Sequence, residues 1–379
     1  MKRVAIIQRR LTHYRVPLFA LLREVLAERC IQLDLLVGKG TLAEEMKSDS
    51  GELPWAISLP TRYLAGERLC WQPIRRFLAA ADLVIVTQEN KLIQNHLLLL
   101  APRRFKLAFW GHGANLQSDN PKGIKERFKR WTTNQVDWWF AYTRLSADLV
   151  VAAGFPDDRV TVLNNTLDTD ELNRQRQLVT PEETQALRES LGFGAGPTGV
   201  FVGSLYVGKR LDFLFAAAEA IRQEIPDFQL LILGEGPERD KVRSWCAAHP
   251  WGVWVGARFG REKVEYMLAS QVTLNPGGVG LGILDSFVCG VPMITTACGI
   301  HGPEIAYLKN GVNGVLTADA LGTYVESSVA LLRDSRALAS MRTECIANGR
   351  EYTLTNMADR FADGVEHCLQ TPRFKRLVC

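Results

Sequence analysis

The stretch from Thr273 to Thr296, TLNPGGVGLGILDSFVCGVPMITT, constrains the fold more than any other part of the chain. An apolar run ends at Leu274, a glycine-rich turn follows, and Ile283 to Val288 has helical character. Gly290 suits the residue just after a helix, and VPMITT has the pattern of a buried strand. The stretch therefore predicts a strand, a turn, a short helix and a second strand, as in α/β folds.

The glycine-rich turn also predicts a kind of ligand. A turn of this type at the start of a helix gathers unpaired backbone N–H groups at the positive end of the helix dipole, which favours phosphate or pyrophosphate. Asp285 lies about one turn into the helix, where its carboxylate would accept from a ribose hydroxyl. The alternative is a tight strand-to-helix connection in which Asp285 only complements the dipole.

Strands and helices alternate through the whole chain, in two series. Its 379 residues are enough for two cores. The first series of strands includes RVAIIQ, IQLDLLVGKG, ADLVIVTQE and KLAFWGHG, and the second includes GVFVGSL, FQLLILGEGP and GVWVGAR. We predict an α/β protein with two Rossmann-like, doubly wound parallel-sheet domains facing a central cleft that holds a ligand.

A polar stretch rich in Glu, Gln, Thr and Gly separates the two series. We predict an N-terminal domain over residues 1–168, a junction over 169–197 with one helix at PEETQALRESLG, and a C-terminal domain over 198–350. A helical tail over 351–379 is expected to pack back toward the N-terminal domain. Polar loops at the strand ends of the first domain lie within 8–14, 87–90 and 111–115. The candidates for the acceptor site or cleft are Arg9, Tyr14, Arg15, Gln88, Glu89, Asn115 and, from the second domain, Glu304.

Composition and missing motifs exclude several classes of protein. No apolar run is long enough to span a bilayer, and VAII near the N-terminus is too short for the apolar core of a signal peptide. The eight cysteines are scattered without metal-ligand spacing, which is typical of reduced thiols in a cytoplasmic protein. Neither GxGxxG after the first strand of a half nor GxxxxGK[ST] is present, which argues against NAD, FAD and P-loop chemistry. We expect no cofactor and no metal.

The first half of the chain is basic and the second mildly acidic. In the first half, the Lys122–Trp131 region interleaves lysines and arginines with aromatic residues. This pattern suits peripheral contact with an anionic membrane, at the cytoplasmic face of the inner membrane, or a lipid-diphosphate acceptor. The alternative is a solvated helix face with core aromatics. We expect no nucleic-acid partner, because no recognition motif is present.

Four blocks of the second half occur in a familiar order: FVGSLYVGKRLDFL (201–214), LILGEGPERDKV (231–242), NPGGVGLGILDSFVCGVPMITT (275–296) and HGPEIAYLKNGVNGVL (301–316). Together they resemble the retaining nucleotide-sugar glycosyltransferases of family 4, which have the GT-B fold. FWGHG (109–113), AYT (141–143) and LNNTLD (163–168) resemble members that assemble polysaccharide and lipopolysaccharide. The resemblance implies metal-independent transfer of a sugar, with retention, from a UDP-sugar or, as second choice, GDP-mannose. The acceptor would be a hydroxyl of a glycan or lipid-linked molecule in bacterial surface polysaccharide biosynthesis.

The resemblance also implies roles for individual residues. Lys209 matches the lysine that binds the donor diphosphate, His112 a position near the donor sugar, and Asp285 the second of two family glutamates, so these three are the catalytic candidates. A cation beside the leaving diphosphate stabilises the charge that develops there. The remaining donor-binding candidates line the same turns: Gly203, Ser204, Gly234, Glu235, Gly236, Pro237, Val255, Gly256, Arg258, Val279, Gly280, Leu281 and Gly282.

The chain departs from the family pattern at two positions. Ser204 stands where the family has an arginine, for which Arg258, Arg9 and Arg15 are candidate substitutes. Gly277 stands where the family has its first glutamate, for which Glu304 is the candidate substitute. The alternatives are therefore another GT-B enzyme, such as an epimerase, an inverting transferase or a phosphorylase, or a catalytically weak relative that binds a glycan or nucleotide.

Overall fold

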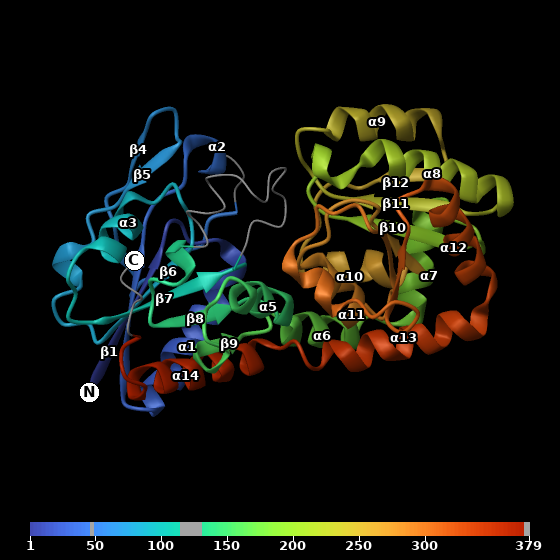
Figure 1. Cartoon of the computed structure of the whole chain (residues 1–379). Helices are drawn as coiled ribbons and strands as arrows, with labels where there is room; N and C mark the ends of the chain where they lie inside the picture. The colour runs from blue at the N-terminus through green and yellow to red at the C-terminus, as the bar shows by residue number, and fades with distance from the viewer. Residues whose placement is uncertain (46–48, 114–130, 375–379) are drawn as a thin grey trace. The chain divides into compact units, whose positions relative to one another are not determined.

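A computed structural model describes residues 1–45, 49–113 and 131–374 of the chain. It divides into two compact units, Met1–Leu167 with Leu354–Cys379 and Asp168–Thr353 (Figure 1). Each unit has its own sheet, and every neighbouring pair of strands in the two sheets is parallel. The predicted fold class, two doubly wound parallel-sheet units, is confirmed.

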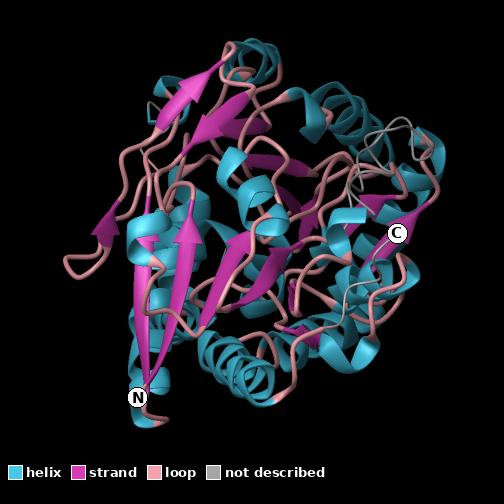
Figure 2. Ribbon diagram, turned by 60° about the vertical axis from the view of Figure 1, so that its left-hand side comes forward, coloured by secondary structure: helices cyan, strands magenta, loops and turns pink. Residues whose placement is uncertain are grey.

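The first unit is built on a seven-stranded sheet of order β3-β2-β1-β6-β7-β8-β9. Figure 2 shows its neighbouring strands pointing the same way, with helices packed beside them. The strands are β1 (Lys2–Gln8), β2 (Ile31–Val37), β3 (Ile57–Ser58), β6 (Leu83–Thr87), β7 (Lys106–Gly111), β8 (Trp138–Ala141) and β9 (Val160–Val162). A separate antiparallel hairpin pairs β4 (Arg62–Leu64) with β5 (Leu69–Trp71).

Strand β1 shows that both faces of this sheet are covered. Val4 and Ile6 belong to one buried core cluster, and Ala5 and Ile7 belong to another. Successive residues of a strand point to opposite faces, so a strand covered on both sides is apolar throughout. The helices of this part of the unit are α1 (Val16–Glu28), α2 (Leu42–Glu45), α3 (Ile93–Leu100) and α5 (Arg144–Ala152), with the 3-10 turns η1 (His13–Arg15), η2 (Arg75–Phe77) and η3 (Asp157–Arg159).

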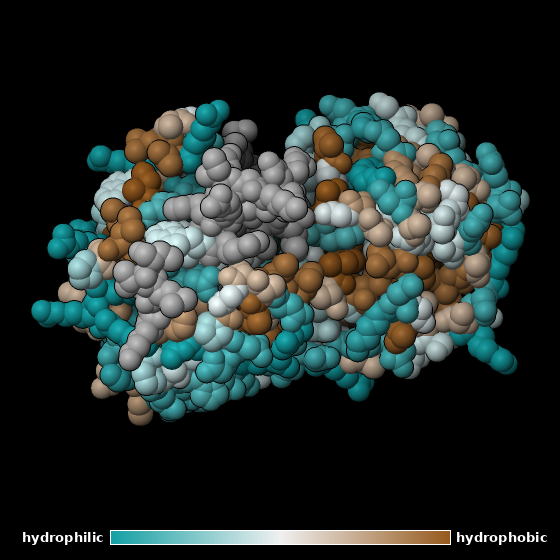
Figure 3. Space-filling view, viewed as in Figure 1, coloured by the Kyte–Doolittle hydropathy of each residue, from teal (hydrophilic) through white to brown (hydrophobic). Residues whose placement is uncertain are grey.

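Helix α14 (Leu354–Gln370) packs in the first unit although it lies near the end of the chain. It buries Met357, Phe361 and Val365 with the residues of strand β1 on one side of the sheet, and its outer side is hydrophilic (Figure 3). Gly364 allows a close approach to the sheet, because a Cβ there would lie 2.5 Å from the Oγ1 of Thr161.

The second unit has a six-stranded sheet of order β12-β11-β10-β13-β14-β15. Its strands are β10 (Thr198–Val202), β11 (Gln229–Leu233), β12 (Gly252–Trp254), β13 (Val272–Leu274), β14 (Met293–Thr296) and β15 (Gly314–Thr317). Its helices are α6 (Thr169–Leu178), α7 (Pro181–Ser190), α8 (Leu211–Glu224), α9 (Arg239–Ala248), α10 (Gly260–Leu268), α11 (Gly282–Cys289), α12 (Leu321–Arg333) and α13 (Ser335–Gly349), with the turns η4 (Val207–Lys209) and η5 (Pro303–Tyr307). Across the described ranges of both units, no helix combines the length and the apolar character needed to cross a bilayer.

The stretch 169–197, which the sequence suggested as a junction with one helix, instead forms two helices of the second unit. Buried Arg188 of α7 explains the attachment. Its guanidinium donates to the Oγ1 of Thr198 at 2.8 Å, to the carbonyl oxygen of Ala269 at 2.7 Å and to that of Gly196 at 2.8 Å. These bonds join α7 to the start of β10 and to the end of α10.

We predict that Gly364→Ala destabilises the chain by about 1–3 kcal/mol, because the new methyl group would overlap Thr161 and Phe140. Gly322→Ala is the matched control, since Gly322 also lies in a helix but has open space around it. The control should be neutral or slightly stabilising. Thermal and urea unfolding of both variants measure the difference, and equal stabilities would refute the close packing of α14.

Candidate functional site

The strand order of the second sheet identifies one place for a ligand. From β10 the chain runs outward through β11 and β12, and then returns to β13 on the other side of β10. In open α/β sheets, ligands bind beyond the carboxyl ends of the two strands between which the order reverses. Here these strands are β10 and β13, so the loops over residues 203–210 and 275–281 form the candidate site.

Hydrogen bonds in both directions join these two loops. The Nζ of Lys209, after β10, donates to the carbonyl oxygen of Gly278, after β13, at 2.5 Å. The N–H of Gly278 donates in return to the carbonyl oxygen of Gly208 at 2.9 Å. A Cβ at Gly277 would lie 2.5 Å from the oxygen of Gly208 and 2.7 Å from the Cα of Lys209. In this structure, position 277 therefore has no room for a side chain.

Lys209 carries a positive charge for which the described residues supply no carboxylate partner. Its ammonium is half-buried, and burial lowers its pKa to about 8, an effect that the nearby Cys298 thiol partly opposes. Since burying a charge is costly unless a counter-charge compensates it, the arrangement favours an anionic ligand. Gly203 leaves space beside this side chain, because a Cβ there would lie 3.4 Å from the Cε of Lys209.

The glycine-rich loop offers unpaired donors at the start of α11. The N–H groups of Gly280 and Leu281 have no hydrogen bond within the described part of the chain, and α11 has no side-chain cap. A Cβ at Gly280 would meet nothing within 4 Å, so space is open beside this backbone. Free N–H groups, the helix dipole and the Lys209 ammonium together make a site for a phosphate-type anion.

Asp285 lies in the first turn of α11 and is already paired with a cation. Its Oδ1 accepts from the Nζ of Lys263 in α10 at 2.6 Å, and both side chains are largely buried. The sequence gives no sign of the role of Lys263, because nothing in the pattern of α10 shows that this lysine contacts α11. The pair holds the Asp285 carboxylate in place, while its Oδ2 has no hydrogen bond in the described residues.

The other donor candidates lie on neighbouring turns at the same edge of the sheet. The N–H of Gly234 donates to the carbonyl oxygen of Gly256 at 2.8 Å, which joins the turns after β11 and β12. Gly234 also lies against the oxygen of Gly203, since a Cβ there would come within 1.9 Å of it. The turns therefore bring together Gly203, Ser204, Gly234, Glu235, Gly236, Pro237, Val255 and Gly256. Arg258, in contrast, contacts Glu262 at 3.4 Å.

A buried imidazole supports the glycine-rich loop from behind. The Nδ1 of His301 accepts from the N–H of Val279 at 3.1 Å, and its Nε2 lies 2.7 Å from the carbonyl oxygen of Thr296. These contacts assign the proton to Nε2. Glu304 is buried in η5, and its Oε2 would lie 2.7 Å from a Cβ at Gly302, next to Val279. Sequence analysis included Glu304 but did not single out His301, although it stands in the fourth motif block.

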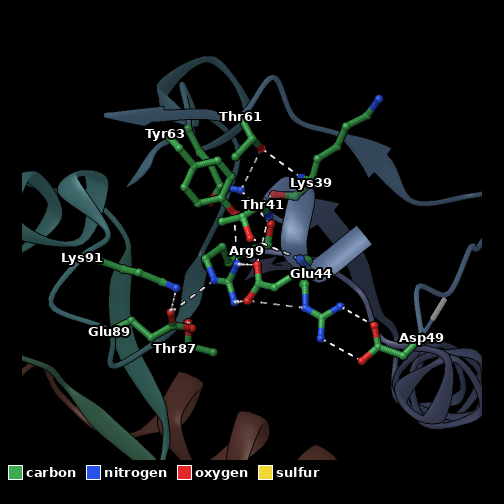
Figure 4. A network of polar contacts seen from close by, with 12 residues as sticks. Arg9, Lys39, Thr41, Glu44, Asp49, Thr61, Tyr63, Thr87, Glu89 and Lys91 are labelled. Carbon is green, nitrogen blue, oxygen red and sulfur yellow. Dashed lines mark hydrogen bonds and ion pairs between the residues drawn. The ribbon is translucent and has the colours of Figure 1, made fainter. Parts of the chain in front are cut away.

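In the first unit, carboxylates neutralise the predicted cleft residue Arg9 (Figure 4). Its guanidinium donates to both oxygens of Glu44 at 2.6 and 2.7 Å, to Glu89 at 3.3 Å and to the Tyr63 hydroxyl at 2.9 Å. Burial disfavours the charged guanidinium, but these partners outweigh it and raise the pKa of Arg9. The hydrogen bonds from Arg9 lower the pKa of Glu44 to about 2. Arg9 thus has little capacity left for an anionic ligand.

The remaining first-unit candidates lie at the carboxyl ends of other strands. Gln88 donates to the Oγ1 of Thr133 at 3.1 Å. Exposed His112 follows β7 and makes an edge contact with the ring of Tyr142, with 4.7 Å between centroids. Tyr14 and Arg15 lie in η1. Asn115 and most of the Lys122–Trp131 region lie outside the described residues.

One cavity of about 240 Å³ in the second unit lies away from the candidate site. Residues of α6, the end of α11 and the end of α13 line it, including Asn173, Val288 and Gly349. Val288 is near the C-terminal end of α11, whereas the glycine-rich loop precedes the N-terminal end. We therefore assign the candidate site to the strand ends and not to this cavity.

Solved structures show which class of protein contains two such units. HepE of Anabaena, crystallised with UDP, matches with a TM-score of 0.70 and 16% identity over 97% of this chain and 100% of that chain. A glycosyltransferase from Rickettsia africae matches with a TM-score of 0.70 and 12% identity over 98% and 99%. At these identities the likeness concerns the fold alone: the chain has the GT-B fold.

The second unit also resembles known proteins in sequence. Residues 196–334 match the family model described as glycosyl transferases group 1. A GDP-mannose-dependent alpha-(1-6)-phosphatidylinositol monomannoside mannosyltransferase from Mycolicibacterium smegmatis is 28% identical over 193 residues, which are 46% of this chain and 48% of that protein. The match thus spans about half of the relative's length. The predicted resemblance to glycosyltransferases is confirmed at the level of the group 1 family model over residues 196–334.

The tight contact at Gly277 generates a prediction about the loop. Gly277→Ala should destabilise the protein by about 1–3 kcal/mol, because the methyl group would overlap the backbone at residues 208–209. Gly280→Ala, two glycines further along the same loop, has open space and should change stability by less than about 0.5 kcal/mol. Thermal unfolding measures both. A tolerated alanine at 277 would contradict the close apposition of the two loops.

Proposed function

We propose that the chain is a retaining glycosyltransferase that moves a sugar from a nucleotide-sugar donor to a hydroxyl of a glycan or lipid-linked acceptor in bacterial surface polysaccharide biosynthesis. The observation that carries this proposal is the uncompensated ammonium of Lys209 beside the free N–H groups of the glycine-rich loop. That pair of features suits a diphosphate. The group 1 glycosyltransferase match over the same residues supports the assignment.

In the proposed reaction, the chain's own groups act mainly on the leaving diphosphate. Lys209 and the N–H groups of Gly280 and Leu281 stabilise the negative charge that develops as the glycosidic bond breaks. Asp285, held by Lys263, accepts from a ribose hydroxyl through its remaining oxygen. The departing diphosphate takes the proton of the acceptor hydroxyl, so the protein needs no strong base of its own. We propose that this chemistry proceeds without a metal, with His112 contributing near the sugar.

For the donor we propose a UDP-sugar first and GDP-mannose second. HepE of Anabaena has been solved with UDP-glucose, and the mycobacterial relative is named as GDP-mannose-dependent. The acceptor is proposed to bind the first unit. The basic and aromatic Lys122–Trp131 region is the proposed point of contact with an anionic membrane surface at its cytoplasmic face.

The donor assignment is tested by thermal shift and calorimetry with UDP, GDP, UDP-sugars and GDP-mannose in the presence of EDTA. We expect one nucleotide class to stabilise the protein, and Lys209→Ala to weaken its binding about 10- to 100-fold, the effect of losing a hydrogen bond to a charged group. The control, Lys241→Ala, removes a lysine of α9 that pairs with Asp212 and Glu238. The absence of a shift with any nucleotide on folded wild-type protein would refute the transferase proposal.

Lys209 should also make donor binding depend on pH. Because burial lowers its pKa to about 8, the free protein carries the ammonium charge below that pH and loses it above. A diphosphate binds the charged form, so its dissociation constant should stay level near pH 7 and rise above pH 8 by up to about tenfold per unit. Calorimetry from pH 7 to 10 measures this. Lys209→Arg keeps its charge and should remove the rise; a rise that persists in this variant would assign it to another group.

A further inference from the structure

Arg15 is a buried cation whose charge no carboxylate of the described residues neutralises. It is 5% exposed, and among the described residues the structure records no ion pair for it. Its Nη2 donates to the Oδ1 of Asn165 at 2.7 Å, but its Nη1 is buried without an acceptor. Buried guanidinium groups are ordinarily paired or fully hydrogen-bonded, so this open donor calls for an explanation.

Arg188, the other buried arginine in the described ranges, shows the contrast. Its guanidinium donates to the carbonyl oxygens of Gly194, Gly196 and Ala269 and to the Oγ1 of Thr198. Both terminal nitrogens donate to two or more acceptors, as expected of a structural arginine. Arg15 has one acceptor in place of four, so a purely structural role does not account for its burial.

The surroundings of Arg15 are aromatic and include a second open donor. The rings of Trp110, Tyr142 and Tyr14 have their centroids 4.9, 5.5 and 5.2 Å from the guanidinium carbon. The Nε1 of Trp110 is also buried, and no described residue accepts a hydrogen bond from it. Two side chains in contact thus each present an unused N–H. An aromatic face attracts a cation but offers no lone pair along these N–H bonds, so both donors stay open.

The cluster lies at the edge of the first sheet where its ligand site is expected. Trp110 is near the carboxyl end of β7, Tyr142 follows β8 and Arg15 follows β1 by way of η1. His112, which contacts Tyr142, is exposed, and Tyr14 is 36% exposed. The cluster therefore reaches the surface beside the predicted catalytic histidine, through Tyr14, whose ring contacts the guanidinium.

We propose that Arg15 and Trp110 form a binding site for an anionic group of the acceptor, a phosphate or carboxylate whose oxygens accept from Nη1 and Nε1. The assignment to the acceptor rests on the proposed transferase function. Anion binding at this cluster does not, and it has its own readout. The site makes the acceptor an acidic molecule, such as a phosphate-bearing lipid or an acidic glycan, in preference to a neutral sugar.

The test uses the full chain in the Lys209→Ala background, which removes the main cation of the donor site. Thermal shift and tryptophan fluorescence are measured with inorganic phosphate, glycerol 1-phosphate and glucuronate, against glycerol and sodium chloride at equal ionic strength. We expect saturable stabilisation by the anions alone. Arg15→Met should weaken it at least tenfold, and Trp110→Phe, which keeps the ring and removes only the N–H, should weaken it severalfold.

Two controls keep the test decisive. Trp139→Phe also removes a buried indole N–H, but one that donates to the carbonyl oxygen of Thr133 at 3.0 Å, so it should lower the melting temperature without changing anion binding. Arg15→Met should fold at least as stably as wild type, because an apolar side chain replaces an unpaired buried charge. If it fails to fold, Trp110→Phe carries the test.

Equal anion binding in the Lys209→Ala protein with and without the Arg15 and Trp110 substitutions would overturn the proposal. So would loss of UDP or GDP binding in Arg15→Met with native Lys209, because that result would place Arg15 in the donor site. Nucleotide binding to wild type is read separately. Its absence would refute the transferase function, while an Arg15-dependent phosphate effect would still establish the anion site.

Discussion

The two hydrogen bonds between residues 208–209 and Gly278 hold the candidate site of the second unit together. They connect the loops after β10 and β13, the two strands between which the sheet order reverses. Lys209 donates one hydrogen bond to a carbonyl oxygen and, among the described residues, none to a carboxylate. Its positive charge is therefore not compensated. The same contact thus sets the loop geometry and leaves the cation available to an anion.

In the first unit, the cation at the corresponding strand end is paired with carboxylates. Its sheet order reverses between β1 and β6, and the loops after these strands carry Arg9 and Glu89. There the cation is neutralised by Glu89 and Glu44, which stabilises the loops but leaves no charge for a ligand. Among the described residues of this unit, Arg15 is a buried arginine without an ion pair, set among aromatic rings near β7 and β8. An unpaired buried charge, and not strand order alone, therefore distinguishes a binding position from a structural one.

Local pattern was enough to predict the two parallel sheets and the glycine-rich loop, since buried strands and turn glycines are visible in the sequence. It missed α6, a polar helix that buries only Thr169 and Leu172 and so has almost no apolar period. It also missed Lys263, because an ion pair between α10 and α11 depends on helix packing. Arg9 and Arg15 looked equivalent in sequence; only their partners, two carboxylates for one and an amide with three rings for the other, separate them.

At Gly277, where the chain departs from the family pattern, the structure leaves no room for a side chain. A side chain there would collide with the backbone at residues 208–209, so a carboxylate at 277 and the observed position of Lys209 exclude each other. A buried carboxylate beside the loop comes from η5, where Glu304 lies near Gly302 and Val279. Restoring the family glutamate would therefore move the lysine that carries the site's charge. A carboxylate that replaces the missing glutamate therefore has to come from the η5 side of the loop. On that side, the hydrogen bonds of His301 to Val279 and Thr296 connect the loop to β14.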